Sequence, residues 1–242
     1  MLVVDHVSHR FGDRLVLDDI NLKVAEGEIL AIMGASGGGK TTLLRCITGL
    51  LTPSEGDIIV DEVSVRKNPE LVRQRLGIVF QSAALFDYLN VEQNVSFGVE
   101  RQKKLRGRAL AEHVQQMLEL VGLQDSAKLM PSELSGGMRK RVGLARALAM
   151  EPAIVLYDEP TSGLDPVTAY AIDSLIVGMR EKLGITSVVV SHDLSSVFRV
   201  ADQIAFLERG ELTYYGDPAG FRSSQNEAIN NLVRKARAET FI

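Results

Sequence analysis

The chain has 242 residues, of which 45% are hydrophobic and 24% charged, and its formal net charge is −4. This composition excludes a disordered or collagen-like chain and favours a soluble α/β protein of one large domain. The slightly acidic balance gives no electrostatic reason to expect nucleic acid as a partner. Cys46 is the only cysteine, so no internal disulfide is expected and a cytosolic setting fits. Because no apolar run reaches 18 residues, any membrane-spanning part is expected from another chain.

The N-terminal stretch predicts strands at 2–4, 15–17 and 20–24, where apolar residues cluster or alternate. Phe11 is an aromatic residue among polar neighbours, beside Gly12. Phe11 could stack on a nucleotide base or pack at the end of a strand. Both interpretations stay open, because each role needs a flat apolar face.

The sequence GASGGGKTT at 34–42 lies between a predicted buried strand at 29–33 and a helical run at 43–50. Its glycines allow positive φ and direct successive N–H groups at one anion, at the N-terminus of the following helix. Lys40 would then reach the outer phosphates, and the Thr41 hydroxyl would ligate Mg²⁺. The complete GxxxxGK[ST] pattern between a strand and a helix predicts a nucleoside triphosphate site, by hypothesis for ATP.

Between Ser82 and about Met150 the strand patterns give way to helical ones, which predicts an inserted helical subdomain. Cations at 139, 140, 141 and 146 share one of its helices, and this charge run predicts a mostly solvated face. The sequence LSGGM at 134–138 opens the same helix. It could present amides and a hydroxyl to a second anion, and a merely flexible helix start is the alternative.

The C-terminal half predicts a buried strand at 154–160 that ends in two carboxylates, and another at 185–192 that ends in histidine. The helix between them should begin at Asp165 and Pro166 and stop at Gly184. A hairpin at 203–215 and a helix-like tail should follow. Strands that alternate with helices favour a mostly parallel sheet, whose carboxyl edge would collect four positions far apart in the chain: Gly34, Gln81, Asp158 and His192.

Phosphoryl transfer needs a phosphate cradle, a metal ion and a group that orients water. Asp158 fits the role of holding Mg²⁺, and Glu159 could polarise the attacking water. The amide oxygen of Gln81 could bind Mg²⁺ or the water, and His192 could donate to the γ-phosphate. A carboxylate pair can instead cap a helix, and a single histidine is often structural. Their shared position at strand ends favours the catalytic interpretation.

Seven motifs occur in the order and approximate spacing of the ATP-binding-cassette ATPases, which the chain resembles over nearly its whole length: Phe11, GASGGGKTT, Gln81, LSGGM, IVLYDEP, SGLD at 162–165, and His192. The resemblance implies one P-loop NTPase cassette over 1–242, with an N-terminal antiparallel β part. A mostly parallel core sheet would come from 1–81 and about 151–220. The helical subdomain would span about 82–150, and a tail about 221–242.

The same resemblance implies that two cassettes dimerise head to tail, with each ATP between the phosphate loop of one copy and LSGGM of the other. Catalytic roles would fall to Glu159, His192 and Gln81, and Mg²⁺ contacts to Thr41, Gln81 and Asp158. Asp165 would communicate across the dimer. Two departures, Met138 where glutamine is usual and Phe11 where tyrosine or tryptophan is frequent, remove no phosphate ligand. The implied ATP contacts are Phe11, Gly34, Ala35, Ser36, Gly37, Gly38, Gly39, Lys40, Thr41 and Thr42, with Ser135, Gly136 and Gly137 in trans.

A narrower resemblance lies in FQSAALFDYLNVEQNVSFGV at 80–99 and LSGGMRKRVGLARALA, which are similar to the ATPase subunits of Mce-linked lipid transporters. It implies phospholipid transport between the inner and outer membranes, from a peripheral position on the cytoplasmic face of the inner membrane. The implied partners are integral permease subunits, an Mce-domain protein and a small regulatory subunit, and the tail segment FRSSQNEAINNLV would aid dimer or regulatory contacts.

The side chains of Ala84, Leu85, Phe86 and Tyr88 could form an apolar groove for a membrane partner's helix, with ordinary packing inside the subdomain as the alternative. Two other functions stay open. One is a cassette importer for amino acids or metal ions, which shares the same chemistry. The other is a soluble cassette ATPase acting on DNA or ribosomes, although such proteins usually carry long coiled-coil insertions or two cassettes in one chain.

Overall fold

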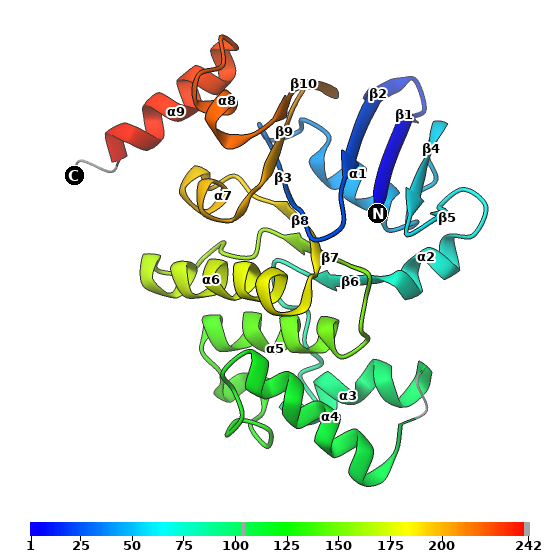
Figure 1. Ribbon diagram of the computed structural model, residues 1–242, viewed down its shortest axis with the longest axis vertical. Coiled ribbons are helices and arrows are strands. Elements are labelled where there is room, and N and C mark those ends of the chain that lie inside the picture. Colours follow the sequence, from blue (N-terminus) through cyan, green and yellow to red (C-terminus); the bar gives the residue numbers. More distant parts are fainter. Residues whose placement is uncertain (103–104, 240–242) are drawn as a thin grey trace.

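The computed structural model describes residues 1–102 and 105–239 and contains two sheets, the smaller of them at the N-terminal end (Figure 1). This sheet has four antiparallel strands in the order β2-β1-β4-β5. Its strands are β1 (Leu2–Phe11), β2 (Arg14–Val24), β4 (Glu55–Val60) and β5 (Val63–Ser64). The last three residues of the predicted tail lie outside the described residues.

The second sheet has six strands in the order β10-β9-β3-β8-β7-β6, and every pair in it is parallel except β9 with β10. Its strands are β3 (Ile29–Gly34), β6 (Leu76–Val79), β7 (Ile154–Asp158), β8 (Thr186–Val190), β9 (Gln203–Glu208) and β10 (Glu211–Gly216). The central strands are continuous apolar runs because helices and the first sheet cover both faces. The predicted mostly parallel sheet and the predicted hairpin are confirmed.

Three helices, α3 (Val91–Gln102), α4 (Gly107–Leu120) and α5 (Gly136–Leu148), pack together at the end of the molecule away from the antiparallel sheet (Figure 1). They share one hydrophobic core with α6 (Pro166–Leu183) and with one face of the second sheet. The remaining helical segments are α1 (Lys40–Ile47), α2 (Pro69–Arg75), η1 (Pro131–Glu133), α7 (Leu194–Val200), α8 (Pro218–Arg222) and α9 (Glu227–Glu239).

The N-terminal strands differ from the sequence-based prediction, because two long strands replace three short ones. The breaks predicted from the polar residues are bulges inside the strands, where His6 and Asp19 adopt positive φ of 49° and 48°. The helix α2 and the short strand β5 were not predicted. The Asn68–Pro69 pair that opens α2 was the available signal.

The predicted mostly solvated face of α5 is wrong for Lys140 and only partly right for Arg141 and Arg146, which are half-buried, whereas Arg139 is exposed as predicted. Lys140 is only 6% exposed, and its amine donates to the carbonyl of Glu159. Arg139 donates to Leu134 O, Arg141 to Val121 O, and Arg146 to the carbonyls of Ala83 and Ala84. All four cations donate to main-chain carbonyls, and the charge pattern alone could not predict those contacts or the burial of Lys140.

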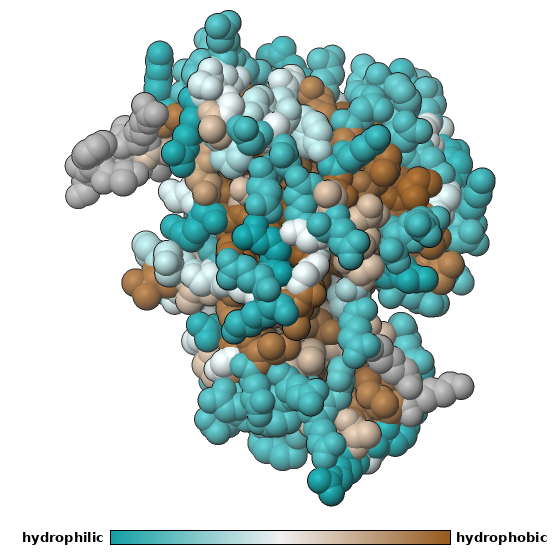
Figure 2. Space-filling view, viewed as in Figure 1, coloured by the Kyte–Doolittle hydropathy of each residue, from teal (hydrophilic) through white to brown (hydrophobic). Residues whose placement is uncertain are grey.

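Within the described ranges, no helix is long and apolar enough to cross a bilayer. On the face seen in Figure 2, the surface over α4 is mainly hydrophilic, and hydrophobic side chains show in patches nearer the sheets. Several large apolar side chains are nevertheless exposed, among them Phe80 and Tyr88, which is 73% exposed.

Candidate functional site

The phosphate loop connects β3 to α1, and its glycines meet two different demands. Gly34, Gly37 and Gly39 adopt positive φ of 145°, 78° and 103°, as predicted. The same prediction was wrong for Gly38, which does not have a positive φ. A Cβ at Gly38 would lie 2.9 Å from the carbonyl oxygen of Leu207 in β9, so close backbone packing requires glycine there.

Lys40 begins α1 and turns back over the loop. Its amine donates to the carbonyls of Gly34 at 2.7 Å and Ala35 at 2.9 Å. Burial lowers the pKa of Lys40, and the nearby carboxylates of Glu159 and Asp158 oppose that shift. The N-cap residue Gly39 supplies no side-chain cap, and the first turn contains no acidic residue. The amides at the start of α1 are therefore arranged to receive an anion.

A cavity of about 400 Å³ lies against this loop and is lined by Phe11, Arg14, Val16 and residues 37–42. Phe11 ends β1 and is 50% exposed, and the His9 ring packs on it edge to face with 4.7 Å between centroids. The exposed ring offers a flat apolar surface beside the phosphate cradle. Arg14 and Val16 were not predicted to line this cavity, and the alternation of the following strand was the only signal for them. Of the other predicted contacts, Ser36 and Thr41 are exposed and Thr42 is half-buried.

Asp158 ends β7, which lies between β8 and β6 in the sheet. Burial raises the pKa of Asp158, the Glu159 carboxylate raises it further, and the cations of Lys140, Arg45 and Lys40 oppose the rise. The predicted site thus places a half-buried carboxylate beside the lysine of the phosphate loop.

Glu159 follows in a left-handed conformation with φ of 49°, and its amide donates to Val190 O at the end of β8. This turn aims its carboxylate at the loop after β8, where Glu159 Oε2 and His192 Nδ1 are 2.8 Å apart. Two residues separated by 33 positions in the chain are therefore in direct contact at the carboxyl edge of the sheet.

Gln81 lies two residues beyond β6 and joins the same network. Its amide nitrogen donates to Ser162 Oγ at 3.1 Å, and the backbone amide of Ser162 donates to Glu159 O at 3.2 Å. Because the amide nitrogen of Gln81 is used in this way, its oxygen is the atom left to offer to a cation or water.

The described residues contain no group of three or more His, Cys, Asp and Glu side chains that could hold a metal ion by themselves. The hydroxyl of Thr41, the amide oxygen of Gln81 and the carboxylate of Asp158 are oxygen donors. Magnesium prefers such donors and is usually held by one or two protein groups together with substrate phosphates. The donor set fits a magnesium nucleotide.

Ser135 caps α5, and its hydroxyl accepts from Met138 N at 3.2 Å. Gly136 and Gly137 follow in the first turn, and a Cβ at Gly137 would lie 2.5 Å from a methyl group of Thr168 in α6. Asp165 caps α6 by accepting from the amides of Val167 and Thr168 at 3.0 Å. Residues 134–138 contribute nothing to the lining of the phosphate-loop cavity, so one copy of the chain does not bring its two glycine-rich segments to one pocket.

Comparison with known proteins agrees with this geometry. Residues 17–162 match the family model described as ABC transporter. The chain is 45% identical over 206 residues to the intermembrane phospholipid transport system ATP-binding protein MlaF of Haemophilus influenzae, covering 84% of this chain and 78% of that protein. It is 41% identical to MlaF of Escherichia coli K12, covering 94% and 86% of the two chains. The glutamine transport ATP-binding protein GlnQ of Geobacillus stearothermophilus is 40% identical, covering 94% and 95%.

Solved structures share the fold. The structure of cbiO1 from Clostridium perfringens, part of the transporter complex cbiONQ, aligns with a TM-score of 0.86 at 32% identity, covering 100% of this chain and 98% of that one. A dimeric post-hydrolysis state of the ATP-binding cassette MJ0796, bound to ADP and Pi, aligns with a TM-score of 0.81 at 31% identity, covering 90% and 98%. The predicted cassette fold is confirmed, and the chain belongs to the ABC transporter family as one of its ATP-hydrolysing cassettes.

Proposed function

We propose that this cassette energises phospholipid transport between the inner and outer membranes, through separate permease subunits at the inner membrane. The observation that carries the proposal is the 41–45% identity to MlaF proteins of two organisms over most of the chain. The cassette itself would lie on the cytoplasmic face. The alternative is an amino-acid importer, which the 40% identity to GlnQ supports.

Each predicted residue has a role in ATP hydrolysis that its position supports. Lys40 would leave the Gly34 and Ala35 carbonyls and contact the outer phosphates, while Phe11 stacks on adenine. Glu159 would polarise the attacking water, and His192, already in contact with Glu159, would donate to the γ-phosphate. Thr41, Gln81 and Asp158 would hold Mg²⁺, which would neutralise charge on the phosphate oxygens.

The ATP site would be completed by a second copy of the chain. Ser135, Gly136 and Gly137 are at the start of α5 and line no part of the phosphate-loop cavity. In a head-to-tail dimer they would reach the partner's nucleotide, with Asp165 at the contact between copies. The dimeric form of the related cassette MJ0796 supports this arrangement.

The permease would dock near the segment that follows Gln81. Leu85 and Phe86 are partly buried there. Leu85 packs on the core of the helical subdomain, and the ring centroids of Phe86 and Phe97 are 4.5 Å apart. Packing within the subdomain therefore accounts for those two side chains. Ala84 and Tyr88 are exposed, and they are the residues of this segment that we assign to docking.

The first test is a mild-detergent pull-down of the chain from its native membrane, with partner proteins and lipids identified by mass spectrometry. Recovery of a multi-span permease with an Mce-domain protein and phospholipid supports the proposed function. Recovery of a permease with a solute-binding protein supports the importer instead. Absence of any membrane protein contradicts both.

The docking assignment predicts that Ala84→Glu combined with Tyr88→Ala releases the permease. Both side chains are exposed, so the melting temperature should stay within a few degrees of wild type. Permease recovery in the pull-down should fall about tenfold, because a charge replaces an apolar contact surface. Leu50→Ser, which alters a side chain that is 64% exposed elsewhere, is the control and should not change recovery. Normal recovery with the double variant would reject this docking site.

A further inference from the structure

Lys140 is a buried cation that the proposed hydrolysis reaction does not use. It lies on α5 and is 6% exposed, although lysine is rarely buried without a partner. Burial lowers the pKa of its amine, and the carboxylates of Glu159 and Asp158 oppose that shift. A buried lysine at this place costs desolvation free energy, so its contacts need a physical account.

The hydrogen-bond partner of Lys140 is the backbone of Glu159. The Lys140 amine donates to Glu159 O at 3.0 Å, and the amide of Ser162 donates to the same oxygen at 3.2 Å. Glu159 holds a φ of 49°, which non-glycine residues adopt only at a cost, and its side chain contacts His192 at 2.8 Å. Fixing this carbonyl fixes the peptide group that follows the Glu159 Cα, and so restricts the direction in which the carboxylate side chain leaves the backbone.

Lys140 also links Glu159 to the start of α5, where the LSGGM segment lies. Ser135 caps this helix, and Lys140 lies little more than one helical turn further along it. The neighbouring cations of α5 reach different targets, since Arg139 donates to Leu134 O and Arg141 to Val121 O. Among the four α5 cations, only Lys140 donates a hydrogen bond to the turn that carries Glu159. A shift of the LSGGM segment would therefore move the donor that holds Glu159.

We infer that Lys140 is a positioning residue that ties the backbone of Glu159 to the LSGGM helix, so that the aim of the carboxylate depends on where that helix lies. The inference rests on the proposed role of Glu159. In the proposed dimer, LSGGM of one copy would contact the nucleotide on the other copy. Lys140 would then transmit occupancy of one ATP site to the carboxylate that acts at the second site.

The test compares Lys140→Met with Lys140→Arg in the full chain. Methionine has similar length but can neither donate nor carry charge, so kcat should fall about tenfold or more while the KM for ATP stays within about twofold. Arginine keeps the donor and the charge and should restore most of the lost kcat. The matched control is Arg141→Met, which removes a neighbouring cation tied to a different carbonyl and should leave kcat within about twofold.

A second measurement needs no turnover. Amide hydrogen exchange over residues 159–164 without nucleotide should be about tenfold faster in Lys140→Met than in wild type, and unchanged in Arg141→Met. If Lys140→Met does not fold, Lys140→Leu, which also lacks a donor and a charge, replaces it in both measurements. Unchanged kcat and unchanged exchange would overturn the inference, as would equal effects of the Lys140 and Arg141 variants. The proposed role of Glu159 fails separately, if Glu159→Gln hydrolyses ATP at the wild-type rate.

Discussion

At the residue scale, Glu159 combines a strained backbone with an ordered side chain. Its left-handed conformation costs on the order of 1 kcal/mol, and the contacts of its amide, carbonyl and carboxylate hold it in place. Glycine would relieve the strain but would remove the carboxylate. A strained residue whose main chain and side chain are both tied down is what a precisely aimed catalytic group requires.

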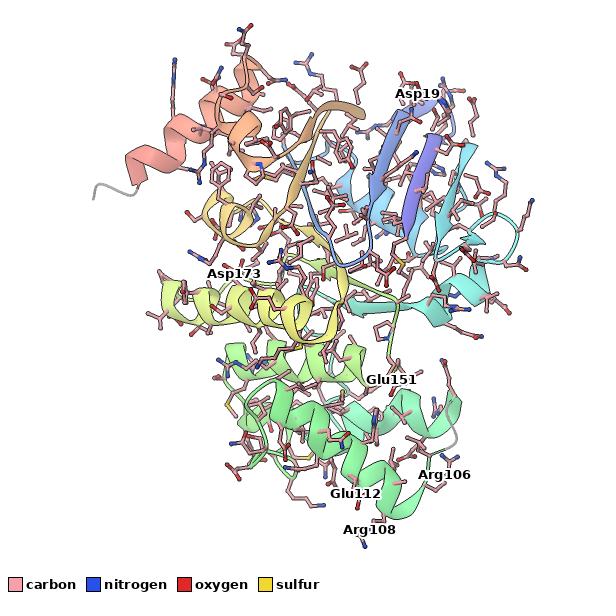
Figure 3. The ribbon with its side chains drawn as sticks, viewed as in Figure 1. Asp19, Arg106, Arg108, Glu112, Glu151 and Asp173 are labelled. Carbon is pink, nitrogen blue, oxygen red and sulfur yellow. The ribbon has the colours of Figure 1, made fainter. Side chains whose placement is uncertain are left out.

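Glu159→Gln is expected to bind ATP with wild-type affinity and to lose at least about a hundredfold in kcat, because an amide cannot accept a proton from water. ATP binding by calorimetry and phosphate release measure the two effects. Glu112→Gln is the control, because Glu112 pairs with Arg108 on the exposed side of α4 (Figure 3). Hydrolysis by Glu159→Gln at the wild-type rate would refute the assignment.

Lys40→Ala is expected to weaken ATP binding at least about tenfold, because the loop loses its cation for the outer phosphates. The loop itself should survive, since its path is set by glycines and by packing on β9. Equilibrium binding of ATP measures the effect, and Lys182→Ala at the exposed end of α6 serves as control. Equal affinity in wild type and Lys40→Ala would contradict the phosphate-cradle assignment.

At this scale the sequence indicated candidate residues but not the physical reason for each of them. The GxxxxGK[ST] motif leaves position 38 open, and the sequence indicated Gly38 only as one of the glycines that allow positive φ. The physical reason for glycine there is the carbonyl of Leu207, which only the folded sheet brings near. The sequence likewise identified Lys140 only as part of a charge run. The burial of that cation depends on a partner 19 positions away, which no local pattern reveals.

At the element scale, the junction of α6 and α7 holds a buried charge. Asp173 is fully buried on the side of α6 that faces α7 (Figure 3), accepts from Ser196 Oγ at 2.6 Å, and pairs with Arg199. Burial raises the pKa of Asp173, and its two partners oppose the rise. This contact fixes α7, the helix that begins directly after His192 and its neighbour Asp193.

Asp173→Ala is expected to lower the free energy of unfolding by roughly 2 to 3 kcal/mol, because it leaves the Ser196 hydroxyl and the Arg199 guanidinium without this acceptor. This loss of stability is smaller than that expected for breaking a fully buried ion pair, because the Arg199 side chain is 35% exposed. Urea unfolding measures the change, with Asp125→Ala at an exposed loop position as control. Equal stability of the two variants would show that the junction contributes little.

The sequence predicted helices and strands best where a capping residue or a glycine in the sequence determines the end of the element. The helix from Pro166 to Leu183 was predicted from its Asp165 cap and from Gly184, which the structure finds at φ of 66°. The two-residue strand β5 gives too short a pattern to detect. Leu183, the last residue of α6, is 50% exposed, because the last turn extends past the core.

At the scale of the whole molecule, four neighbouring strands build the candidate site. Gly34, Asp158, His192 and Gln81 come from β3, β7 and the segments after β8 and β6, which lie side by side in the sheet. The alternation of strands and helices was enough to predict this gathering. It could not predict the proposed contribution of the LSGGM segment from a second copy, because residues 134–138 do not line the phosphate-loop cavity of their own copy.

Nucleotide should therefore control association of two copies. We expect Glu159→Gln to be a monomer without nucleotide and a dimer with ATP, because unhydrolysed ATP bridges the phosphate loop and the partner's LSGGM segment. Adding Ser135→Arg should abolish that dimer, and Ser174→Arg on the exposed side of α6 should not. Sedimentation velocity distinguishes the species. A dimer that persists with Ser135→Arg would argue against the head-to-tail arrangement.

The place of β3 between β8 and β9 has a consequence for how the protein is made. The strand and its phosphate loop at 29–42 leave the ribosome long before the strands that pair with β3 on either side, which are β8 (Thr186–Val190) and β9 (Gln203–Glu208). Translation at roughly 5–20 residues per second leaves about 8 to 30 s during which β3 has neither neighbour. During that interval its apolar surface must be shielded by other parts of the nascent chain or by chaperones. ATP can assist folding only after β8 and β9 have been synthesised.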